Sequence, residues 1–213
     1  MSWLVEGLEG DEQAQAAEIL EQCPTVVLRE GTSHAAARLP SAEFLLVEEG
    51  IVLITRLRAG ATRRMILAVA GEGAVLTPPG VDDRLEVLAP TWLTALTPAA
   101  REALLRLPGA ATVLADGLAA QLTDAFESLG HFSSVRHVER VREKLLQLAR
   151  SHGRVVPGGI RLDLPLTHEL LGEMIGSARE TVTWAVAQLT REGFLSREGR
   201  CYRLAVSPEA LAS

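Results

Sequence analysis

Residues 166–193 read LTHELLGEMIGSARETVTWAVAQLTREG and predict two short helices joined by a tight turn. Thr167 suits the N-cap of the first helix, and Gly176 suits its end because glycine readily adopts the left-handed conformation. The second helix is expected to start near Ser177 and to run to residue 192. This pattern predicts a helix-turn-helix. We expect the apolar residues that recur at helical spacing to form its shared core: Leu170, Met174, Ile175, Val182, Val186 and Leu189.

A β-hairpin is predicted directly after the second helix. Residues 194–196 and 201–204 favour strands, and the four residues between them contain Gly199, which suits a turn. Another short strand is predicted at residues 160–164. A helix-turn-helix followed by such a hairpin is a winged helix, and this wing carries three arginines: Arg197, Arg200 and Arg203.

The start of the second helix carries side chains that suit the reading of DNA. In the major groove, arginine can donate two hydrogen bonds to guanine and glutamate can accept from cytosine. Arg179 and Glu180 occupy this turn, and the hydroxyls of Ser177 and Thr181 suit phosphates. Taken alone, Arg179 and Glu180 could be a solvated pair at a helix end, but the winged-helix context favours base reading. The expected DNA-binding residues are Thr167, His168, Ser177, Ala178, Arg179, Glu180, Thr181, Thr183, Trp184, Arg197 and Arg200.

The first half of the chain has the spacing of β-structure. Short apolar runs separated by glycine and proline predict several strands of a small antiparallel sandwich or roll. A short amphipathic helix is predicted before them, at residues 12–22, and Thr97–Pro98 is expected to start another helix after them. The predicted strands are residues 25–28, 44–47, 51–57, 65–69 and 84–88.

A long helix is predicted beyond Pro108–Gly109, with an apolar seam of heptad-like spacing. We interpret the seam as a dimer interface, although such a stripe could also pack on the chain's own sheet. A separate helix is expected at residues 136–150, with a domain boundary near residues 133–134. The predicted domains are thus 1–108, an effector-type β-roll; 109–135, the dimerisation helix and hinge; and 136–213, the winged helix. The expected seam residues are Leu114, Leu118, Leu122, Ala125, Leu129 and Phe132.

Charge is divided unevenly along the 213 residues, although the net charge is -6. From residue 136 onward there are 12 Lys and Arg against 9 Asp and Glu, whereas the preceding part has 9 against 18. The basic balance of the last part favours a nucleic-acid partner for it. The two cysteines, Cys23 and Cys201, lie too far apart for a CxxC zinc site. Since the sequence also has no long apolar run, we expect a cytoplasmic protein without a membrane partner.

Residues 175–182, IGSARETV, followed by Leu189 and the hairpin, resemble the helix-turn-helix of the cyclic-AMP receptor protein / fumarate–nitrate reductase regulator (CRP/FNR) family. Residues 44–52 resemble that family's strand–glycine–strand hairpin, and the order of predicted elements matches over essentially the whole chain. The resemblance implies an α+β fold: a cyclic-nucleotide-binding-like β-roll (jelly roll), a long dimerisation helix and a C-terminal winged helix-turn-helix.

The resemblance also implies a function. Family members are homodimeric transcription regulators that read an inverted repeat in double-stranded DNA and contact RNA polymerase, and the analogy favours activation over repression. In that family Arg179 and Glu180 would be base-reading positions. Trp184 stands where the family often has a third base-reading arginine, so the operator of this chain is expected to differ.

The expected β-roll departs from the family's phosphate-binding cassette, which has glycine and glutamate, a short helix and then an arginine. Residues 71–73, GEG, match its beginning, but Pro78 and Pro79 replace the helix and remove amide donors. Arg84 is the nearest arginine, and the neighbouring Asp82 and Asp83 would repel a phosphate. We therefore expect no binding of cyclic AMP.

No catalytic motif is found, and we expect neither an enzyme nor a cofactor or metal site. Two alternatives stay open. The winged helix could bind a protein without reading DNA, and the β-roll could respond to an unidentified small ligand. The basic balance of the last domain and the Arg179–Glu180–Thr181 turn favour DNA.

Overall fold

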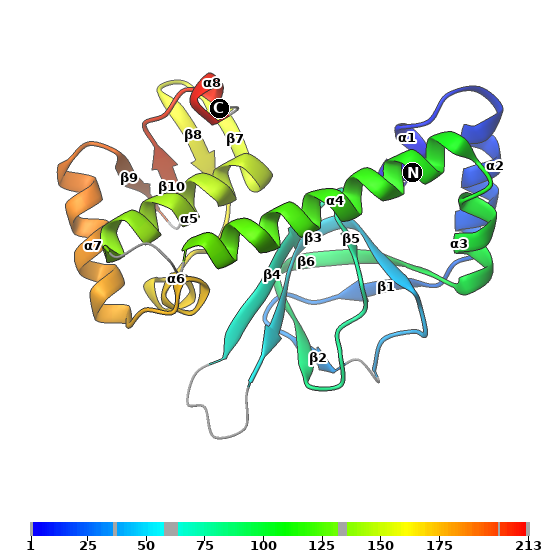
Figure 1. The fold of residues 1–213 in the computed structure, drawn as a ribbon, viewed down its shortest axis with the longest axis horizontal. Helices are drawn as coiled ribbons and strands as arrows, with labels where there is room; N and C mark the ends of the chain where they lie inside the picture. The colour runs from blue at the N-terminus through cyan, green and yellow to red at the C-terminus, as the bar shows by residue number, and fades with distance from the viewer. Residues whose placement is uncertain (1, 36–37, 58–63, 132–135, 200, 212–213) are drawn as a thin grey trace. The chain divides into compact units, whose positions relative to one another are not determined.

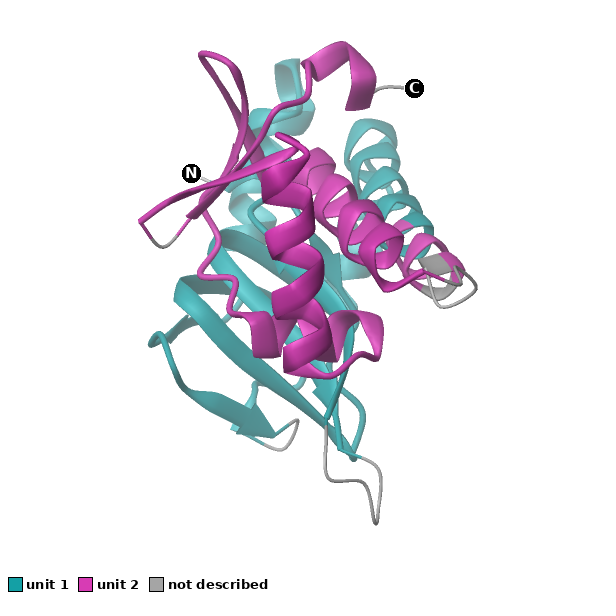
Figure 2. Ribbon diagram, turned by 90° about the vertical axis from the view of Figure 1, so that its left-hand side faces the viewer, with its two compact units in different colours: residues 1–123 teal, residues 124–213 magenta. Residues whose placement is uncertain are grey.

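The computed structural model describes residues 2–35, 38–57, 64–131, 136–199 and 201–211. The chain divides into two compact units, Met1–Thr123 and Asp124–Ser213 (Figure 2). The division falls within a long helix, whereas the sequence analysis placed a boundary near residues 133–134, which lie outside the described residues. We describe each unit by itself.

Unit 1 is a six-stranded antiparallel sheet with helices at the ends of its sequence (Figure 1). The path of paired strands is β1-β6-β3-β4, while β2 pairs with β6 and β5 pairs with β3. The strands are β1 (Thr25–Leu28), β2 (Ser33–Ala35), β3 (Phe44–Arg56), β4 (Met65–Gly71), β5 (Val75–Leu76) and β6 (Asp83–Leu96). The helices are α1 (Trp3–Glu6), α2 (Gly10–Glu21), α3 (Pro98–Leu104) and the first part of α4 (Pro108–His131).

The prediction of a hairpin around Gly50 is wrong, because Gly50 lies inside a single strand, β3, that continues on both sides of it. Gly50 has φ 90°, and a Cβ here would lie 2.2 Å from the Pro90 carbonyl oxygen. The register of β3 against β6 shifts on both sides of Gly50, so the glycine forms a bulge rather than a turn. Before the bulge in the sequence, Leu45 and Leu46 of β3 pair with β5, and after it residues 51–56 of β3 pair with β4. One bent strand thus serves two neighbours.

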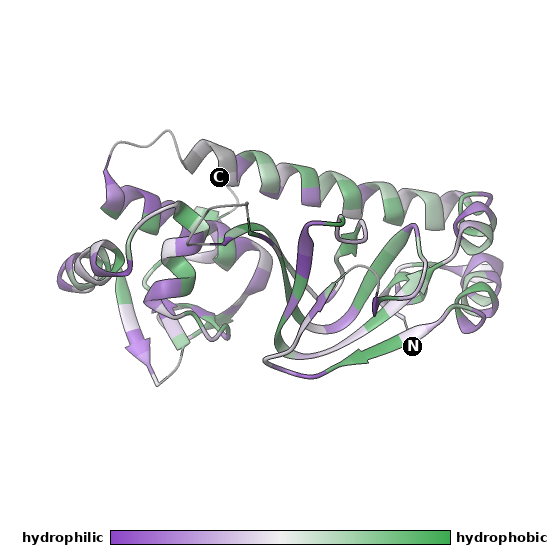
Figure 3. Ribbon diagram, turned by 90° about the horizontal axis from the view of Figure 1, so that it is seen from below, coloured by the Kyte–Doolittle hydropathy of each residue, from purple (hydrophilic) through white to green (hydrophobic). Residues whose placement is uncertain are grey.

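The predicted seam of α4 is divided between two environments. Leu114 is 2% exposed and belongs to the core of unit 1, and Leu118 packs against the same core. Here the alternative interpretation, packing on the chain's own domain, is the correct one. Leu122 and Phe126, a residue that the seam did not include, are 56% and 63% exposed (the hydropathy colours of Figure 3 alternate along this helix). Ala125 is half-buried; the side chain of Leu129 and all of Phe132 lie outside the description.

Helix ends follow the local sequence closely. Thr97 caps α3 as expected, since its hydroxyl accepts from the Ala100 amide at 3.2 Å. The Glu12 carboxylate accepts from the Gly109 amide at 2.8 Å and so satisfies the start of α4 from α2. Among the described residues, no single helix is long and apolar enough to cross a membrane. Only α3 and residues 108–128, bent by 115°, meet that test as a pair.

Unit 2 contains the end of α4, a three-helix core and a four-stranded antiparallel sheet of order β7-β8-β10-β9. Helix α5 packs against both α6 and α7. The sequence analysis missed β7 and α8, and in unit 1 it missed α1, β2 and β5. All of these elements are four residues or shorter, which leaves little periodicity to detect. The elements are α5 (His137–His152), β7 (Gly153–Val156), β8 (Gly159–Leu162), α6 (His168–Ile175), α7 (Arg179–Arg191), β9 (Leu195–Glu198), β10 (Cys201–Leu204) and α8 (Pro208–Leu211).

A polar cluster joins the end of α4 to α5 within unit 2. Lys144, the only lysine of the chain, is 5% exposed, and its ammonium donates to Ser128 Oγ at 3.0 Å and to Gln147 Oε1 at 2.7 Å. Gln147 Nε2 in turn donates to the Asp124 carbonyl oxygen at 2.8 Å. Burial lowers the pKa of Lys144 to about 8, and the nearby charges of Asp124 and Glu127 only partly oppose this shift.

We expect Lys144→Met to stabilise unit 2 below pH 8, by up to roughly 3 kcal/mol, because a pKa lowered from 10.5 to about 8 measures the penalty on the buried charge. Below pH 8 the amine is protonated in the folded and the unfolded chain, so the penalty is fully present. Between pH 8 and 10.5 the folded chain releases its proton first and the advantage of the variant shrinks. Urea unfolding, monitored by the NMR methyl signals of Leu145 and Leu148, measures this difference.

Arg150→Met is the matched control, since Arg150 lies on the same helix as Lys144 but is exposed and pairs with Glu127. Its effect on unfolding free energy should not vary over this range. A pH-independent effect of Lys144→Met would contradict the perturbed ionisation.

Candidate nucleic-acid interface

The turn between α6 and α7 fixes the angle at which α7 is presented. The Thr167 hydroxyl accepts from the Leu170 amide at 3.0 Å, and Gly176 ends α6 in the left-handed conformation with φ 65°. Both features confirm the predicted capping. The predicted shared core is also present: Leu170, Met174, Ile175, Val182 and Leu189 are buried, and Val186 is partly buried.

One face of α7 is buried and the opposite face is open to solvent. Arg179, Glu180, Thr183 and Trp184 are exposed, and Thr181 is partly exposed. The structure records no ion pair that joins Arg179 and Glu180 to each other or to another described residue, so their charged groups are available to a ligand. The buried face carries Val182, Ala185 and Leu189.

A cavity of about 500 Å³ lies where the start of α6, the start of α7 and the wing meet. Two cationic side chains, Arg179 from α7 and Arg197 from β9, reach it from different elements. The remaining lining residues are Leu166, Thr167, His168 and Glu169. Two guanidinium groups beside a helix start favour an anion such as a phosphate.

His168 connects α6 to α7 beside this cavity. The Thr183 hydroxyl donates to the Arg179 carbonyl oxygen at 2.9 Å, so the 2.8 Å contact between Thr183 Oγ1 and His168 Nδ1 has the ring nitrogen as donor. Burial, followed by the charges of Arg197 and Arg179, lowers the pKa of His168. Both causes disfavour the protonated form of the imidazole.

Ser177 is not placed as the sequence analysis expected. Its side chain is 6% exposed, and its hydroxyl lies 2.9 Å from Nδ1 of His137 on α5. The residue precedes α7 inside the tight turn, where the chain faces α5 rather than solvent. The proposed phosphate contact through this hydroxyl is therefore wrong for the structure as it stands.

Charge pairing distinguishes Arg179 and Arg197 from several other arginines of unit 2, although Arg191 on α7 likewise has no ion pair recorded with a described residue. Arg203 on the wing pairs with Glu198 at 3.0 Å and also contacts Ser196. Arg197 donates to the Gly199 carbonyl oxygen but has no recorded ion pair with a described residue. Arg200 lies outside the described residues. Carboxylates also compensate other arginines of this unit, in the pairs Arg142–Glu192, Arg150–Glu127, Arg154–Asp163 and Arg161–Asp163.

Residues 139–213, which include both helices of the turn and the wing, match the family model of the Crp-like helix-turn-helix domain. The C-terminal domain belongs to the Crp-like helix-turn-helix family. The sequence resemblance to the CRP/FNR family is thus confirmed for this domain.

Relatives align with part of the chain. It is 38% identical over 61 residues to the CRP-like cAMP-activated global transcriptional regulator of Mycobacterium tuberculosis, an alignment that covers 29% of this chain and 27% of that protein. It is 36% identical over 95 residues to the global nitrogen regulator of Synechocystis sp., covering 43% of this chain and 40% of the regulator. The sequence matches therefore span well under half the length of either relative.

The fold matches over nearly the whole chain. A cyclic nucleotide-binding domain containing protein from Listeria monocytogenes superposes with a TM-score of 0.75 at 14% identity, covering 92% of this chain and 98% of that structure. This likeness confirms the predicted α+β fold, with a cyclic-nucleotide-binding-like roll before the Crp-like domain.

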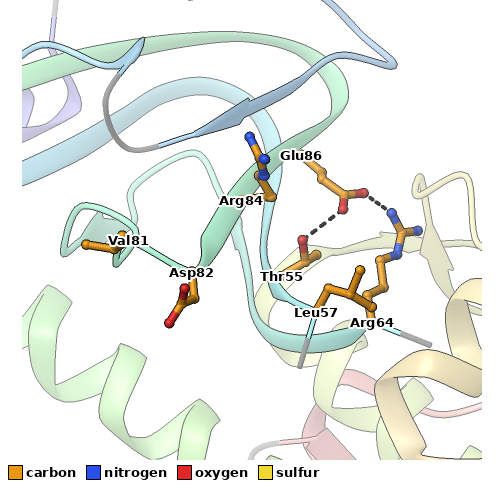
Figure 4. Close-up of a pocket in the computed structure, with 7 residues that line it drawn as sticks. All are labelled: Thr55, Leu57, Arg64, Val81, Asp82, Arg84 and Glu86. Carbon is orange, nitrogen blue, oxygen red and sulfur yellow. Dashed lines mark hydrogen bonds and ion pairs between the residues drawn. The ribbon is translucent and has the colours of Figure 1, made fainter. Parts of the chain in front are cut away.

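A second cavity, of about 420 Å³, lies in the roll of unit 1 (Figure 4). Glu86 accepts from Thr55 at 2.8 Å and pairs with Arg64, while Arg84 is exposed and has no recorded partner among the described residues. Val81, Asp82 and Leu57 complete the lining. Nearby, Arg56 pairs with Asp83 at 2.6 Å, which lowers the pKa of that carboxyl. Two arginines here, Arg56 and Arg64, are thus paired with carboxylates of β6.

The stretch that departs from the cyclic-nucleotide cassette is fully described. Residues 71–83 contain a turn, the short strand β5 and extended chain, but no helix. His34 lies in β2 and contacts the Thr32 hydroxyl at 2.8 Å. No group of three or more His, Cys, Asp or Glu side chains suited to a metal ion occurs in the part of the chain that the structure describes.

We expect Arg197→Ala to raise the pKa of His168, because it removes a positive charge that disfavours the protonated ring. Arg179→Ala should act in the same direction and less strongly. An NMR titration of the His168 ring signals in the free protein measures both shifts. Arg154→Ala, which removes an arginine already paired with Asp163, is the control and should leave the titration unchanged. Unchanged titration in all three variants would contradict the clustering of these side chains.

Proposed function

We propose that this chain is a sequence-specific transcription regulator that binds double-stranded DNA as a homodimer, with one α7 in the major groove of each half of an inverted repeat. The main support is the open face of α7, where Arg179 and Glu180 are exposed at the start of the helix and form no ion pair with a described residue. The relatives of the Crp-like domain carry the names of transcription regulators, which agrees with this proposal. Activation rather than repression is the proposed direction, by analogy with the CRP/FNR family.

The remaining contacts go to the DNA backbone. Arg197 and the start of α6 flank the cavity beside Arg179, and a phosphate there would gain two guanidinium partners. Thr167 and His168 line the same cavity. We propose Arg200, which lies in the turn of the wing by its sequence position, as a further backbone contact. Such contacts fix the position of the domain without distinguishing bases.

The second copy binds through the exposed stripe of α4. Leu122 and Phe126 lie one helical turn apart and expose large apolar surfaces, an arrangement that favours helix–helix association. A dimer would hold two α7 helices about 34 Å apart, one turn of duplex, as an inverted repeat requires.

The proposed regulator works without cyclic AMP. No helix offers amides between Gly71 and Asp83, and Pro78 and Pro79 lack the N–H groups that a buried phosphate needs. In unit 1, Arg56 and Arg64 are both paired with carboxylates of β6. The free dimer is therefore proposed to be competent for DNA on its own.

Arg179→Ala should weaken binding to the selected operator by about 1–3 kcal/mol and relax the preference at one base pair of each half-site. Arg197→Ala should weaken binding to all duplexes alike and reduce the salt dependence by about one counterion per subunit, because it removes a phosphate contact. Selection from random duplexes, followed by titration at several salt concentrations, measures both effects. If both variants affect every sequence equally, Arg179 does not read bases.

The same titration with cyclic AMP tests independence from that ligand. We expect less than about a 10-fold change in affinity. Tighter binding beyond that limit would show that the roll uses cyclic AMP despite its altered cassette.

Phe126→Glu should convert the dimer into a folded monomer that binds DNA poorly, because the charge would be buried in an apolar interface. Sedimentation at equilibrium measures the mass, and circular dichroism verifies the fold. Position 126 is the sharper choice than Leu118, whose packing against the core of unit 1 would mix dimerisation with folding. Gln121→Glu, on the same helix, is the control; a variant at position 126 that stays dimeric would exclude this stripe as the interface.

A further inference from the structure

Trp184 is the large apolar side chain on the open face of α7. Its indole is 58% exposed, and the structure records no hydrogen bond or ring contact between it and another described residue. Among the described residues of unit 2, the other large apolar side chains with comparable exposure are Phe126 on α4 and Val155 on β7. The cost of exposing an indole to water on this helix suggests that a partner covers it.

Trp184 lies on the same face of α7 as Glu180 in the proposed base-reading turn. It lies four residues after Glu180, so both side chains project from one side of the helix, opposite the buried Val182, Ala185 and Leu189. Thr183, its exposed neighbour, already uses its hydroxyl within the domain, for the Arg179 carbonyl and the His168 ring. Trp184 is therefore the side chain of this second turn that is free to meet a base.

The chemistry of the major groove narrows what an indole ring can recognise there. Base edges present hydrogen-bond donors and acceptors, and the apolar feature among them is the C5-methyl group of thymine. A flat apolar ring gains most by covering that methyl, and it would leave the amino group of cytosine or adenine without a partner.

We propose that Trp184 covers the thymine methyl at one position of each half-site and thereby sets the base preference there. The inference rests on the proposed function, in which α7 enters the major groove. Burial of one methyl group predicts about a 4-fold preference for thymine over the same base without the methyl, per half-site.

The test compares selections from random duplexes for the wild-type chain, Trp184→Ala and Trp184→Arg. The wild type should select thymine at a position that Trp184→Ala no longer discriminates, while the guanine preference that depends on Arg179 stays in both. Trp184→Arg should change the preference at that position from thymine to guanine. Thr190→Ala, an exposed residue of α7 whose hydroxyl bonds its own helix, is the matched control and should select the wild-type motif.

A chemical substitution in the DNA isolates the methyl group. Replacing the selected thymine by uracil, which lacks only the methyl, should weaken wild-type binding about 4-fold per half-site and leave Trp184→Ala unaffected. If the wild type binds the uracil duplex as tightly as the thymine duplex, the inference is overturned. The contact would then come from the indole N–H or be made to the sugar.

The outcomes separate this inference from the proposed function. A wild-type chain that selects no sequence contradicts both. A wild-type chain that selects an inverted repeat, with Trp184→Ala selecting the identical motif, contradicts the inference alone. If Trp184→Ala weakens binding to all duplexes by the same factor, the inference alone is again contradicted, because a uniform loss would place the indole ring against the DNA backbone.

Discussion

The packing of α7 onto α6 and α5 is the constraint on which the candidate interface depends. The left-handed turn at Gly176 reverses the chain within a few residues, and Val182 and Leu189 then bury one face of α7. Because α7 buries this one face, the residues on its opposite face remain exposed to solvent. Arg179, Glu180 and Trp184 are thus presented together by the core and not by contacts of their own.

Electrostatics gives the same face its sign in a protein that is acidic overall. Many arginines of unit 2 are neutralised locally, as in the Arg142–Glu192 and Arg154–Asp163 pairs. Arg179 and Arg197 have no such partner recorded among the described residues. The lining of the cavity therefore holds two arginines against one carboxylate, Glu169, although the net charge of the chain is -6. Burial, and after it the charges of Arg197 and Arg179, lowers the pKa of the neighbouring His168 ring.

The sequence predicted best what short-range chemistry determines. The cap at Thr167, the stop at Gly176 and the apolar spacing of α6 and α7 all act within a few residues, and each is found as expected. The prediction of a hairpin at Gly50 was wrong because a local pattern does not show that Gly50 lies against Pro90 and Thr91 of another strand, β6. The predictions for Leu114, as a dimer contact, and for Ser177, as a phosphate contact, were wrong for a related reason. Periodicity and residue type indicate that a side chain is buried or hydrogen-bonded, but tertiary contacts decide which neighbour it meets.

The cluster around Lys144 has a consequence for the covalent chemistry of this protein. The chain has a single lysine, and its amine is enclosed by Ser128 and Gln147 between two helices. Acetylation, ubiquitin transfer and aldehyde crosslinking all begin with attack by a neutral, accessible amine. In the proposed DNA complex, the cationic side chains of the winged helix that approach DNA are guanidinium groups, so fixation methods that depend on lysine would capture this protein on its target inefficiently.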